Sequence, residues 1–491
     1  MESGTKWILC FAVVSNIAMI FANALMTVLG PSQPFLAQQL DVEIDTISSM
    51  WTISFMSAII GSLMASFTFK PYIINPLWKM VIFGCGSALS GLCTICVPYS
   101  PSFGHLSILL VLNNIISGYW MTGNGGMFVY TLGPKKSRSL VMLHHFTVSL
   151  GFLLGPMLMG HYFTDSLPSN DTICSSNMTL AIEAPPKVSL NLNQVPHEPP
   201  HHVPSRLSHQ PFWILGILQV ASSLLYFGMT FVPYQMPVQE ELKVVQQAKN
   251  LKEAFTEDLR SLIPLMLFFA LSCGSERIFQ SMQFSFGLCG PLQLSPPEAV
   301  ITDKSYNGGF MLGRFIGMFV AHVGSPKLML KISLAICFPA SLFTSIFAAK
   351  SQLLFVSCAG VYGFAISWQF GAAYSWAAKY LDVVGSRSAV ISIGCALGSL
   401  LTPVISGFLF KYSSPMALWH LNSFIVIMQI VLLGYLHRNF KEGPKNDGLN
   451  KTDDGPEYIR VVTELADEMD ETLITGSGRK GRKISLYAFQ T

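Results

Sequence analysis

The chain has 491 residues, of which 51% are hydrophobic and only 12% are charged. Soluble domains carry about twice that charged fraction, so the composition excludes a water-soluble globule and predicts a membrane protein. The formal net charge of +3 is small and spread along the chain, which excludes nucleic acid as a partner.

Apolar runs long enough to cross a membrane recur along the chain. A crossing helix needs about 20 mainly apolar residues. The first run, Trp7 to Gly30, is too long for a signal peptide and has no cleavage pattern, so we predict a retained helix. The twelve predicted spans are 7–29, 46–69, 78–98, 106–131, 140–163, 211–232, 261–287, 306–323, 327–347, 352–378, 385–410 and 415–437.

The distribution of lysine and arginine predicts the orientation. With the N-terminus inside, most basic loop residues fall in cytoplasmic loops. The short outer loops then hold the bases Lys304, Lys350 and Lys411, and the first outer loop holds the acids Asp41, Glu43 and Asp45. We therefore expect both termini in the cytoplasm, and we expect a multi-pass protein of the plasma membrane.

Two halves and two polar segments form the predicted domain organisation. We predict an N-terminal six-helix bundle at 1–232, a cytoplasmic linker at 233–260, a C-terminal bundle at 261–437 and a disordered tail at 438–491. The outer loop 164–210 contains glycosylation sequons, at Asn170 and Asn177.

Most of the ten cysteines lie inside apolar runs, where they act as small hydrophobic residues. Cys174 lies in a loop, and Cys96 and Cys289 lie near outer span ends. We expect no disulfide among these three. We also expect no metal site, because the Cys/His spacing of such sites is missing.

A glycine-rich stretch occurs once in each half. Runs 150–160 and 397–407 share Leu-Gly, Leu-Leu, Pro and Gly in register. Glycines at helical spacing let another membrane helix approach closely. A span repeated in the two halves of a long apolar chain is typical of a transporter built from two like bundles.

Ionisable residues inside spans are candidates for function, because a charge at the bilayer centre costs about 2.5–3.5 kcal/mol. Glu276 lies in the seventh span, with Gln280 and Gln283 on the same helix face. The carboxylate can bind Na⁺ or carry a proton, and the amides can bind sugar hydroxyls. The alternative is a structural ion pair between Glu276 and Arg314. Arg277 should point elsewhere, and we assign it no role.

Amides and indoles in two other spans suit a sugar ring, because the aromatic face meets C–H groups while amides meet hydroxyls. The candidates are Asn113, Trp120 and Asn124 in the fourth span and Trp368, Gln369 and Trp376 in the tenth. The alternative is ordinary hydrogen bonding and packing between helices.

Three further polar residues complete the candidates. Asn16 and Asn23 are expected to face one cavity, and His145 is expected to be an ordinary hydrogen-bonded histidine. Nucleophile elbows and phosphate-binding loops are missing, so we expect neither an enzyme nor an ATP-driven pump.

Several motifs together resemble the major facilitator superfamily, and within it the sodium-dependent glucose transporters. The resemblance covers about residues 7–437, and its motifs are 29–32, 122–124, 143–146, 274–276 and 309–314. It implies an all-α membrane fold of twelve helices in two pseudo-symmetric bundles. It also implies co-transported Na⁺, and we place that coupling at Glu276. We expect a monomeric secondary transporter, without a resident cofactor, that moves a small neutral solute, glucose or a related hexose, by alternating access.

Two departures from the family pattern leave the function open. Ala65 stands where the family has an acid in the loop after the second span, and Met121 stands where this branch has an acid before Thr-Gly. One alternative is an uncoupled facilitator of sugar, polyol or urea. Another is a transporter-like scaffold or trafficking protein.

Overall fold

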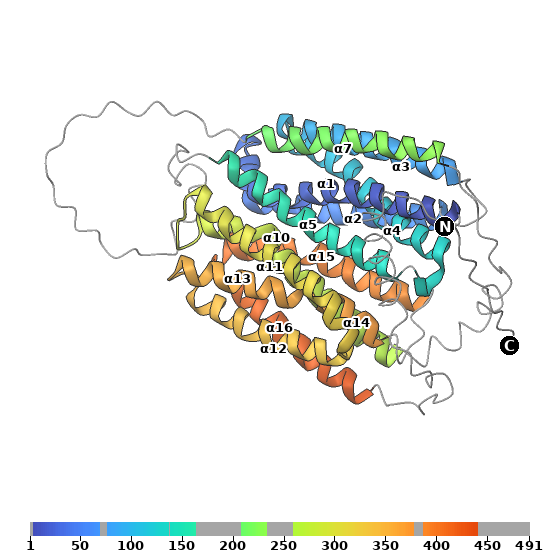
Figure 1. Cartoon of the computed structure of the whole chain (residues 1–491). Helices are drawn as coiled ribbons and strands as arrows, with labels where there is room; N and C mark the ends of the chain where they lie inside the picture. The colour runs from blue at the N-terminus through green and yellow to red at the C-terminus, as the bar shows by residue number, and fades with distance from the viewer. Residues whose placement is uncertain are drawn as a thin grey trace, which may run out of the picture. The chain divides into compact units, whose positions relative to one another are not determined.

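The computed structural model describes the chain in six stretches, and in them it is almost entirely helical (Figure 1). The stretches are 3–68, 76–136, 138–163, 208–232, 259–377 and 386–439. The N-terminal half contains α1 (Ser3–Gln39), α2 (Ile44–Thr68), α3 (Pro76–Cys96), α4 (Phe103–Lys136), α5 (Arg138–Tyr162) and α7 (Gln210–Gly228). The C-terminal half contains α10 (Leu259–Cys289), α11 (Pro296–Val323), α12 (Pro326–Phe347), α13 (Gln352–Ile366), α14 (Gln369–Ala377), α15 (Ser386–Tyr412) and α16 (Ala417–Asn439).

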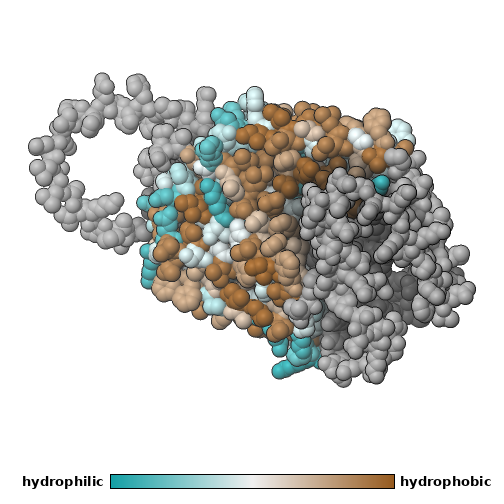
Figure 2. All heavy atoms as spheres, in the orientation of Figure 1, coloured by the Kyte–Doolittle hydropathy of each residue, from teal (hydrophilic) through white to brown (hydrophobic). Residues whose placement is uncertain are grey.

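The predicted all-α membrane architecture is confirmed. In the described stretches, 11 helical segments are long and apolar enough to cross a membrane, with α13 and α14 forming one of them. The remaining predicted span corresponds to α11, which is 28 residues long but carries Asp303, Lys304 and Arg314. Figure 2 shows a mainly apolar flank, with hydrophilic residues gathered along its left edge and at its lower corner, as expected for helices that face lipid.

Serine and proline set the beginnings of several C-terminal helices. The Ser325 side chain accepts a hydrogen bond from the backbone N–H of Leu328 at 3.2 Å and caps α12. At α11, Glu298 accepts hydrogen bonds from both the backbone N–H and the hydroxyl of Ser295. Each helix then continues with proline, whose fixed φ suits the first helical turn.

The two halves repeat one packing scheme. In the N-terminal half, α1 packs on α5, α2 on α4 and α3 on α7. In the C-terminal half, α10 packs on α15, α11 on α13 and α12 on α16. In each half, the first helix packs on the fifth, the second on the fourth and the third on the sixth. The halves meet mainly where α2 contacts α15, α5 contacts α11 and α1 contacts α10.

Glycine makes the close contacts within each half. A β-carbon at Gly151 of α5 would overlap the backbone carbonyl of Ile20 on α1. A β-carbon at Gly398 of α15 would overlap the backbone carbonyl of Ala270 on α10. The predicted close approach at these glycine-rich faces is therefore confirmed in both halves.

The last glycine of each run faces the opposite half instead. Gly160 of α5 lies against Val300 and Lys304 of α11, and Gly407 of α15 lies against Ser48 of α2. Each glycine-rich helix thus holds the first helix of its own half and the second helix of the other half.

Cys289, at the end of α10, is disulfide-bonded, so the expectation of no disulfide was wrong. Its position was recognised, but a sequence alone does not pair cysteines. The other cysteines of the described stretches are free.

Several predictions lie outside the described residues. They include Asn170 and Asn177, most of the linker 233–260 and nearly all of the tail 438–491. The predicted domain boundaries stay predictions.

Candidate functional site

Three polar side chains of α10 lie together, and we call them the α10 triad: Glu276, Arg277 and Gln280. Nη2 of Arg277 lies 3.9 Å from Oε1 of Glu276. Gln280 donates from Nε2 to Glu276 Oε1 at 3.2 Å, and Arg277 donates from Nη1 to the Gln280 side-chain oxygen. The side chains of Glu276 and Arg277 each keep 16% of their surface exposed, so the triad is not sealed.

The α10 triad faces the N-terminal half. The Arg277 guanidinium carbon lies 4.7 Å from the centroid of the Phe55 ring on α2. On α1, Gly30 packs so closely against the Gln280 backbone carbonyl that a β-carbon would overlap it. A cation over an aromatic ring contributes about 0.5–2 kcal/mol. This contact can therefore orient Arg277 and still break when the halves move.

Arg277 supplies the charge balance that Glu276 needs inside the membrane. An ion pair held by further hydrogen bonds is less costly there than an isolated charge. The expectation that Arg277 points away from Glu276 was wrong. Helical spacing separates the two side chains at their β-carbons, but the long arginine stem bends back toward its neighbour.

Arg314 does not pair with Glu276, the partner that the sequence analysis considered. Its Nη1 donates to the backbone carbonyl of His145 on α5 at 2.7 Å, and its guanidinium carbon lies 4.5 Å from the Phe310 ring centroid. Arg314 thus ties α11 to α5, across the interface between the halves. Glu276 makes its ion pair with Arg277 instead.

Gln283 is on α10 but does not join the α10 triad. It is fully buried and lies beside the carboxyl group of Asp303 on α11, itself 3% exposed. Sequence reasoning missed Asp303 because the predicted span began at 306. The capping sequence from Ser295 to Glu298 was the signal that the helix begins earlier.

The fourth-span candidates lie within the packing of the N-terminal half. Asn113 accepts a hydrogen bond from Ser90 on α3 at 2.7 Å. Trp120 is 1% exposed and stacks on Tyr226 of α7, with ring centroids 6.3 Å apart. Asn124 is fully buried near the same tyrosine. Asn113 and Trp120 thus make contacts between helices, which is the alternative role considered for them from the sequence.

Two of the tenth-span candidates also make contacts between helices. Trp368 donates from Nε1 to the Gly313 carbonyl at 2.6 Å, which joins the α13–α14 break to α11. Gln369 accepts from Gln429 of α16 at 3.0 Å. Trp376 lines a pocket between α12 and α16. Gln369 also accepts a hydrogen bond from Ser272 of α10 at 2.9 Å, one helical turn before Glu276, but none of the three side chains takes part in the contacts of the α10 triad.

The two asparagines of α1 bind within their own half. Asn16 Oδ1 accepts from Thr147 Oγ1 at 3.0 Å and lies 3.0 Å from Nδ1 of His144. Asn23 donates to the carbonyl of Met19 at 2.8 Å. In this conformation Asn16 links α1 to α5.

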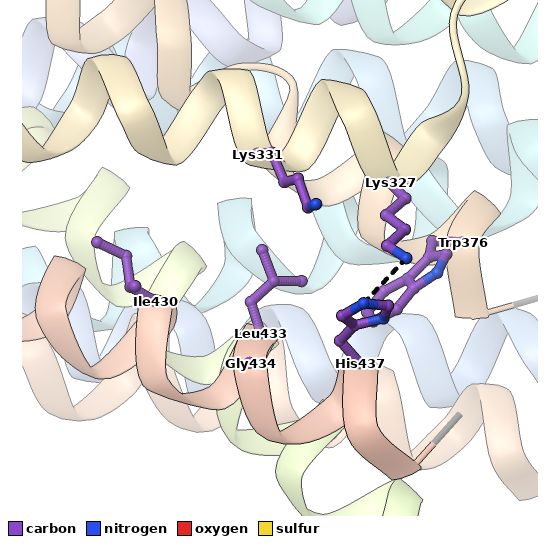
Figure 3. A pocket seen from close by; sticks show the side chains of 7 residues that line it. All are labelled: Lys327, Lys331, Trp376, Ile430, Leu433, Gly434 and His437. Carbon is purple, nitrogen blue, oxygen red and sulfur yellow. Dashed lines mark hydrogen bonds between the residues drawn. The ribbon is translucent and has the colours of Figure 1, made fainter. Parts of the chain in front are cut away.

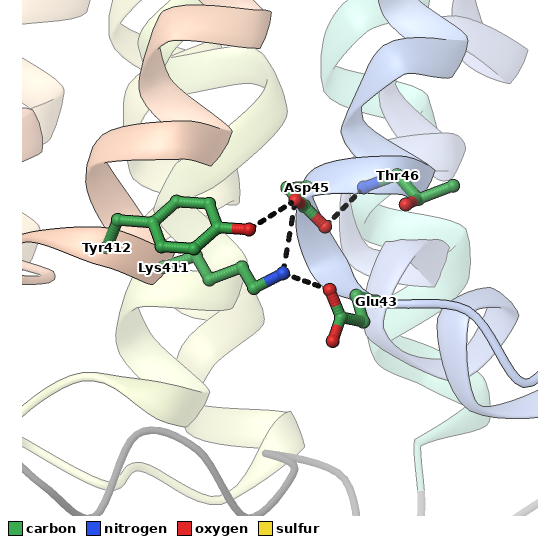
Figure 4. A network of polar contacts seen from close by, with 5 residues as sticks. All are labelled: Glu43, Asp45, Thr46, Lys411 and Tyr412. Atoms are coloured by element: carbon green, nitrogen blue, oxygen red, sulfur yellow. Dashed lines mark hydrogen bonds and ion pairs between the residues drawn. The ribbon is translucent and has the colours of Figure 1, made fainter.

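A cluster of charged residues joins the halves at the end of α15 (Figure 4). Lys411 donates to Glu43, and its Nζ lies 3.2 Å from Oδ2 of Asp45. The Tyr412 hydroxyl lies 3.5 Å from the same oxygen. We call this cluster the α2–α15 contact. Its residues are separated by 366 and 368 positions, so no local pattern predicts it.

Two polar contacts between the halves lie at opposite ends of the helices, while a third, from Thr52 Oγ1 of α2 to the Leu400 carbonyl of α15 at 3.0 Å, lies nearer the middle of α15. The α2–α15 contact joins the beginning of α2 to the end of α15. The bond from Arg314 to His145, which we call the α5–α11 contact, joins the beginning of α5 to the later part of α11. Glu276 lies near the middle of α10, between them.

This arrangement is the fold of the major facilitator superfamily. A crystal structure of the nucleoside transporter NupG superposes with a TM-score of 0.56 at 13% identity, over 90% of this chain and 100% of that one. A bacterial homologue of the human lysosomal transporter Spinster, inward-facing and unoccupied, gives a TM-score of 0.55 at 15% identity, over 90% of this chain and 96% of that one.

Comparison of sequences gives the more specific similarity. Sodium-dependent glucose transporter 1 of Danio rerio is 23% identical over 88% of this chain and 68% of its own length. The Rattus norvegicus protein of that name is 23% identical over 81% of this chain and 78% of its own length. Major facilitator superfamily domain-containing protein 4A of Mus musculus is 21% identical over 78% of this chain and 82% of its own length. No family model matches the chain.

The predicted resemblance to this superfamily and to sodium-dependent glucose transporter 1 is therefore confirmed. The chain is a multi-pass membrane protein with a transporter's architecture. Its relatives are transporters and not enzymes, in agreement with the expectation from its motifs.

Proposed function

We propose that this chain is a secondary transporter that moves a small neutral solute, a hexose or a close relative, by alternating access. The observation that carries the proposal is the position of the α10 triad. Its carboxylate, guanidinium and amide lie partly exposed at the junction of α1, α2 and α10. Relatives named as sodium-dependent glucose transporters support a sugar as the solute.

The chemistry of the α10 triad suits a polyhydroxylated solute. Gln280 offers both a donor and an acceptor, Arg277 offers donors and Glu276 offers acceptors. Sugar hydroxyls need both kinds of partner. Entry of a solute would replace the hydrogen bonds that these side chains now make with one another, so the buried polar groups would keep partners throughout.

Na⁺ coupling is proposed to pass through Glu276. A carboxylate oxygen is a suitable ligand for a hard cation, and Na⁺ would compete with Arg277 for it. Arg277 would then be released to bind the solute. In this scheme the cation and the solute favour each other because both depend on separating the same ion pair.

Uptake by purified full-length protein in proteoliposomes tests this assignment. We expect Glu276→Gln to lower the Na⁺-dependent part of glucose uptake at least about tenfold, equivalent to about 1.4 kcal/mol. Glu298→Gln is the matched control, because it removes the same charge from an exposed turn of α11. Unchanged Na⁺-dependent uptake in Glu276→Gln would contradict the assignment.

An uncoupled facilitator is the second candidate, and one observation favours it. Arg277 already balances the charge of Glu276, so the site is neutral without a cation. Wild-type uptake that ignores the Na⁺ gradient and pH would select this candidate. No uptake of any solute in proteoliposomes would reject both and favour the scaffold alternative.

We propose that the chain works as a monomer in the plasma membrane, with both termini in the cytoplasm. The disulfide at Cys289 supports this orientation, because disulfides persist in oxidising compartments. Cys289 ends α10, the seventh span, whose far end would face outward when the chain starts inside. Protease or antibody access to each terminus in intact cells tests the orientation.

A further inference from the structure

A small pocket lies between α12 and α16, away from the α10 triad (Figure 3). Its volume is about 200 Å³. Lys327 and Lys331 come from α12 and His437 comes from the last turn of α16, while Ile430 and Leu433 form the apolar part of the wall. The remaining lining residues are Trp376 and Gly434.

Basic side chains surround this pocket. In the part of the chain that the structure describes, neither Lys327 nor Lys331 has a carboxylate partner, and Lys327 Nζ instead lies 3.2 Å from Nε2 of His437. The two lysines are four positions apart on one helix, where like charges repel. Arg438 adds a further base to the last turn of α16. The basic groups around the pocket therefore attract an anion, while the surface inside the pocket is apolar.

The pocket also opens onto a surface suited to hydrocarbon. Leu328 and Ile332 on α12 are exposed, as are Ile427 and Val431 on α16. Both helices pack mainly on other helices of the C-terminal half. In a membrane these side chains face lipid, so an acyl chain can lie along them and enter the apolar pocket while its head group stays beside the basic side chains.

The size of the pocket argues against an enclosed small molecule. Ligand cavities in proteins are usually about 300–1,000 Å³. A volume near 200 Å³ with an apolar surface suits part of an acyl chain, with the head group outside beside the basic side chains. Basic pockets between membrane helices at the cytoplasmic side are known to hold lipid head groups.

We propose that this pocket is a binding site for an anionic phospholipid of the cytoplasmic leaflet. Its phosphate lies between Lys327, Lys331 and His437, and one acyl chain follows Ile430 and Leu433. The helix order places the beginning of α12 at the opposite end from the disulfide of Cys289, which supports the cytoplasmic leaflet. That leaflet carries most of the anionic lipid in a plasma membrane.

Native mass spectrometry of the purified full chain tests the proposal. The protein is first equilibrated with vesicles of phosphatidylcholine alone, or of phosphatidylcholine with phosphatidylserine. We expect the wild type to retain phosphatidylserine and the double variant Lys327→Gln, Lys331→Gln to retain about tenfold less. The charge-matched control is Lys304→Gln with Lys350→Gln, at the other end of the helices, and it should retain phosphatidylserine fully.

Two further arms make the result decisive. Replacing both Lys327 and Lys331 by arginine keeps the charge and should keep the lipid, which separates recognition from misfolding. Adding inorganic phosphate or glycerophosphoserine, which lack acyl chains, should not displace the lipid. Equal retention by the Lys327→Gln, Lys331→Gln variant would overturn the proposal. Equal retention of phosphatidylcholine, or displacement by inorganic phosphate alone, would also overturn it.

Discussion

The glycine-rich helices α5 and α15 are two copies of one element that differ in their charged contacts. Both use glycine to approach the first helix of their own half, and both use a later glycine to approach the second helix of the other half. On α5, however, the backbone carbonyl of His145 near the helix beginning accepts a hydrogen bond from Arg314. On α15, Lys411 near the helix end binds Glu43 and Asp45.

The difference shows how two like halves can move in an alternating way. The glycine contacts within each half keep its helix pairs rigid, whichever end is open. The α2–α15 contact and the α5–α11 contact lie at opposite ends, so one can open while the other stays closed. They also differ in strength. A hydrogen bond from a charged group contributes about 1.5–3 kcal/mol, whereas an exposed ion pair contributes about 0–1 kcal/mol.

The largest expected effect comes from filling the shared glycine contacts. Valine at Gly151 or at Gly398 should destabilise the protein by about 3 kcal/mol, the upper part of the usual range for overpacking. Thermal unfolding of the purified protein measures this. Gly228 and Gly371 have open space at the β-carbon, so alanine at either position is the control. Near-normal melting of both valine variants would show that the glycine contacts are not needed.

The next effect concerns the α5–α11 contact. Arg314→Ala should lower solute uptake by about tenfold or more, because the His145 carbonyl loses a charged donor. Arg314→Lys keeps a charge that can reach the carbonyl and should recover part of the uptake. If alanine and lysine variants behave alike and transport normally, this contact plays no part in the cycle.

The smallest effect concerns the α2–α15 contact. Lys411→Gln should raise the open population at that end by about fivefold at most, since Glu43 is 56% exposed and water screens the pair. Maleimide labelling of a cysteine at Ser48, which is buried against Gly407, reports this opening. Salt should increase labelling in the lysine-containing protein and have little effect in Lys411→Gln. Salt-independent labelling in both would refute an electrostatic closure.

Much of the fold could be predicted because membrane spans are recognised in a sequence by their length and apolar composition. The glycine repeat at 150–160 and 397–407 also predicted a close helix approach in each half, because a bare helix face lets another membrane helix come near. It did not predict which helix would be the partner. Asp303 was missed because it lies outside the apolar run from which the span was predicted. Charged residues shorten an apolar run, so α11 looked shorter in the sequence than it is.

The orientation of side chains was harder to predict. Several spans are apolar on every side, so hydrophobicity does not tell which face points to the centre. Trp120 is an example: it packs on α7 in the structure, although the residues around it in the sequence fit a sugar-binding face equally well. Lys411 was recognised as an outer basic residue and Glu43 as an outer acid. Only the folded chain shows that they meet.

Distance measurements across both ends of the interface test the central claim most directly. Spin labels introduced as unnatural amino acids at Thr46 and Phe408 report the α2–α15 end, and labels at Leu143 and Phe319 report the α5–α11 end. All four positions are exposed, so labelling should leave the packing intact. On addition of a transported hexose, one distance should lengthen while the other shortens. Distances that change together, or not at all, would contradict alternating movement of the two halves.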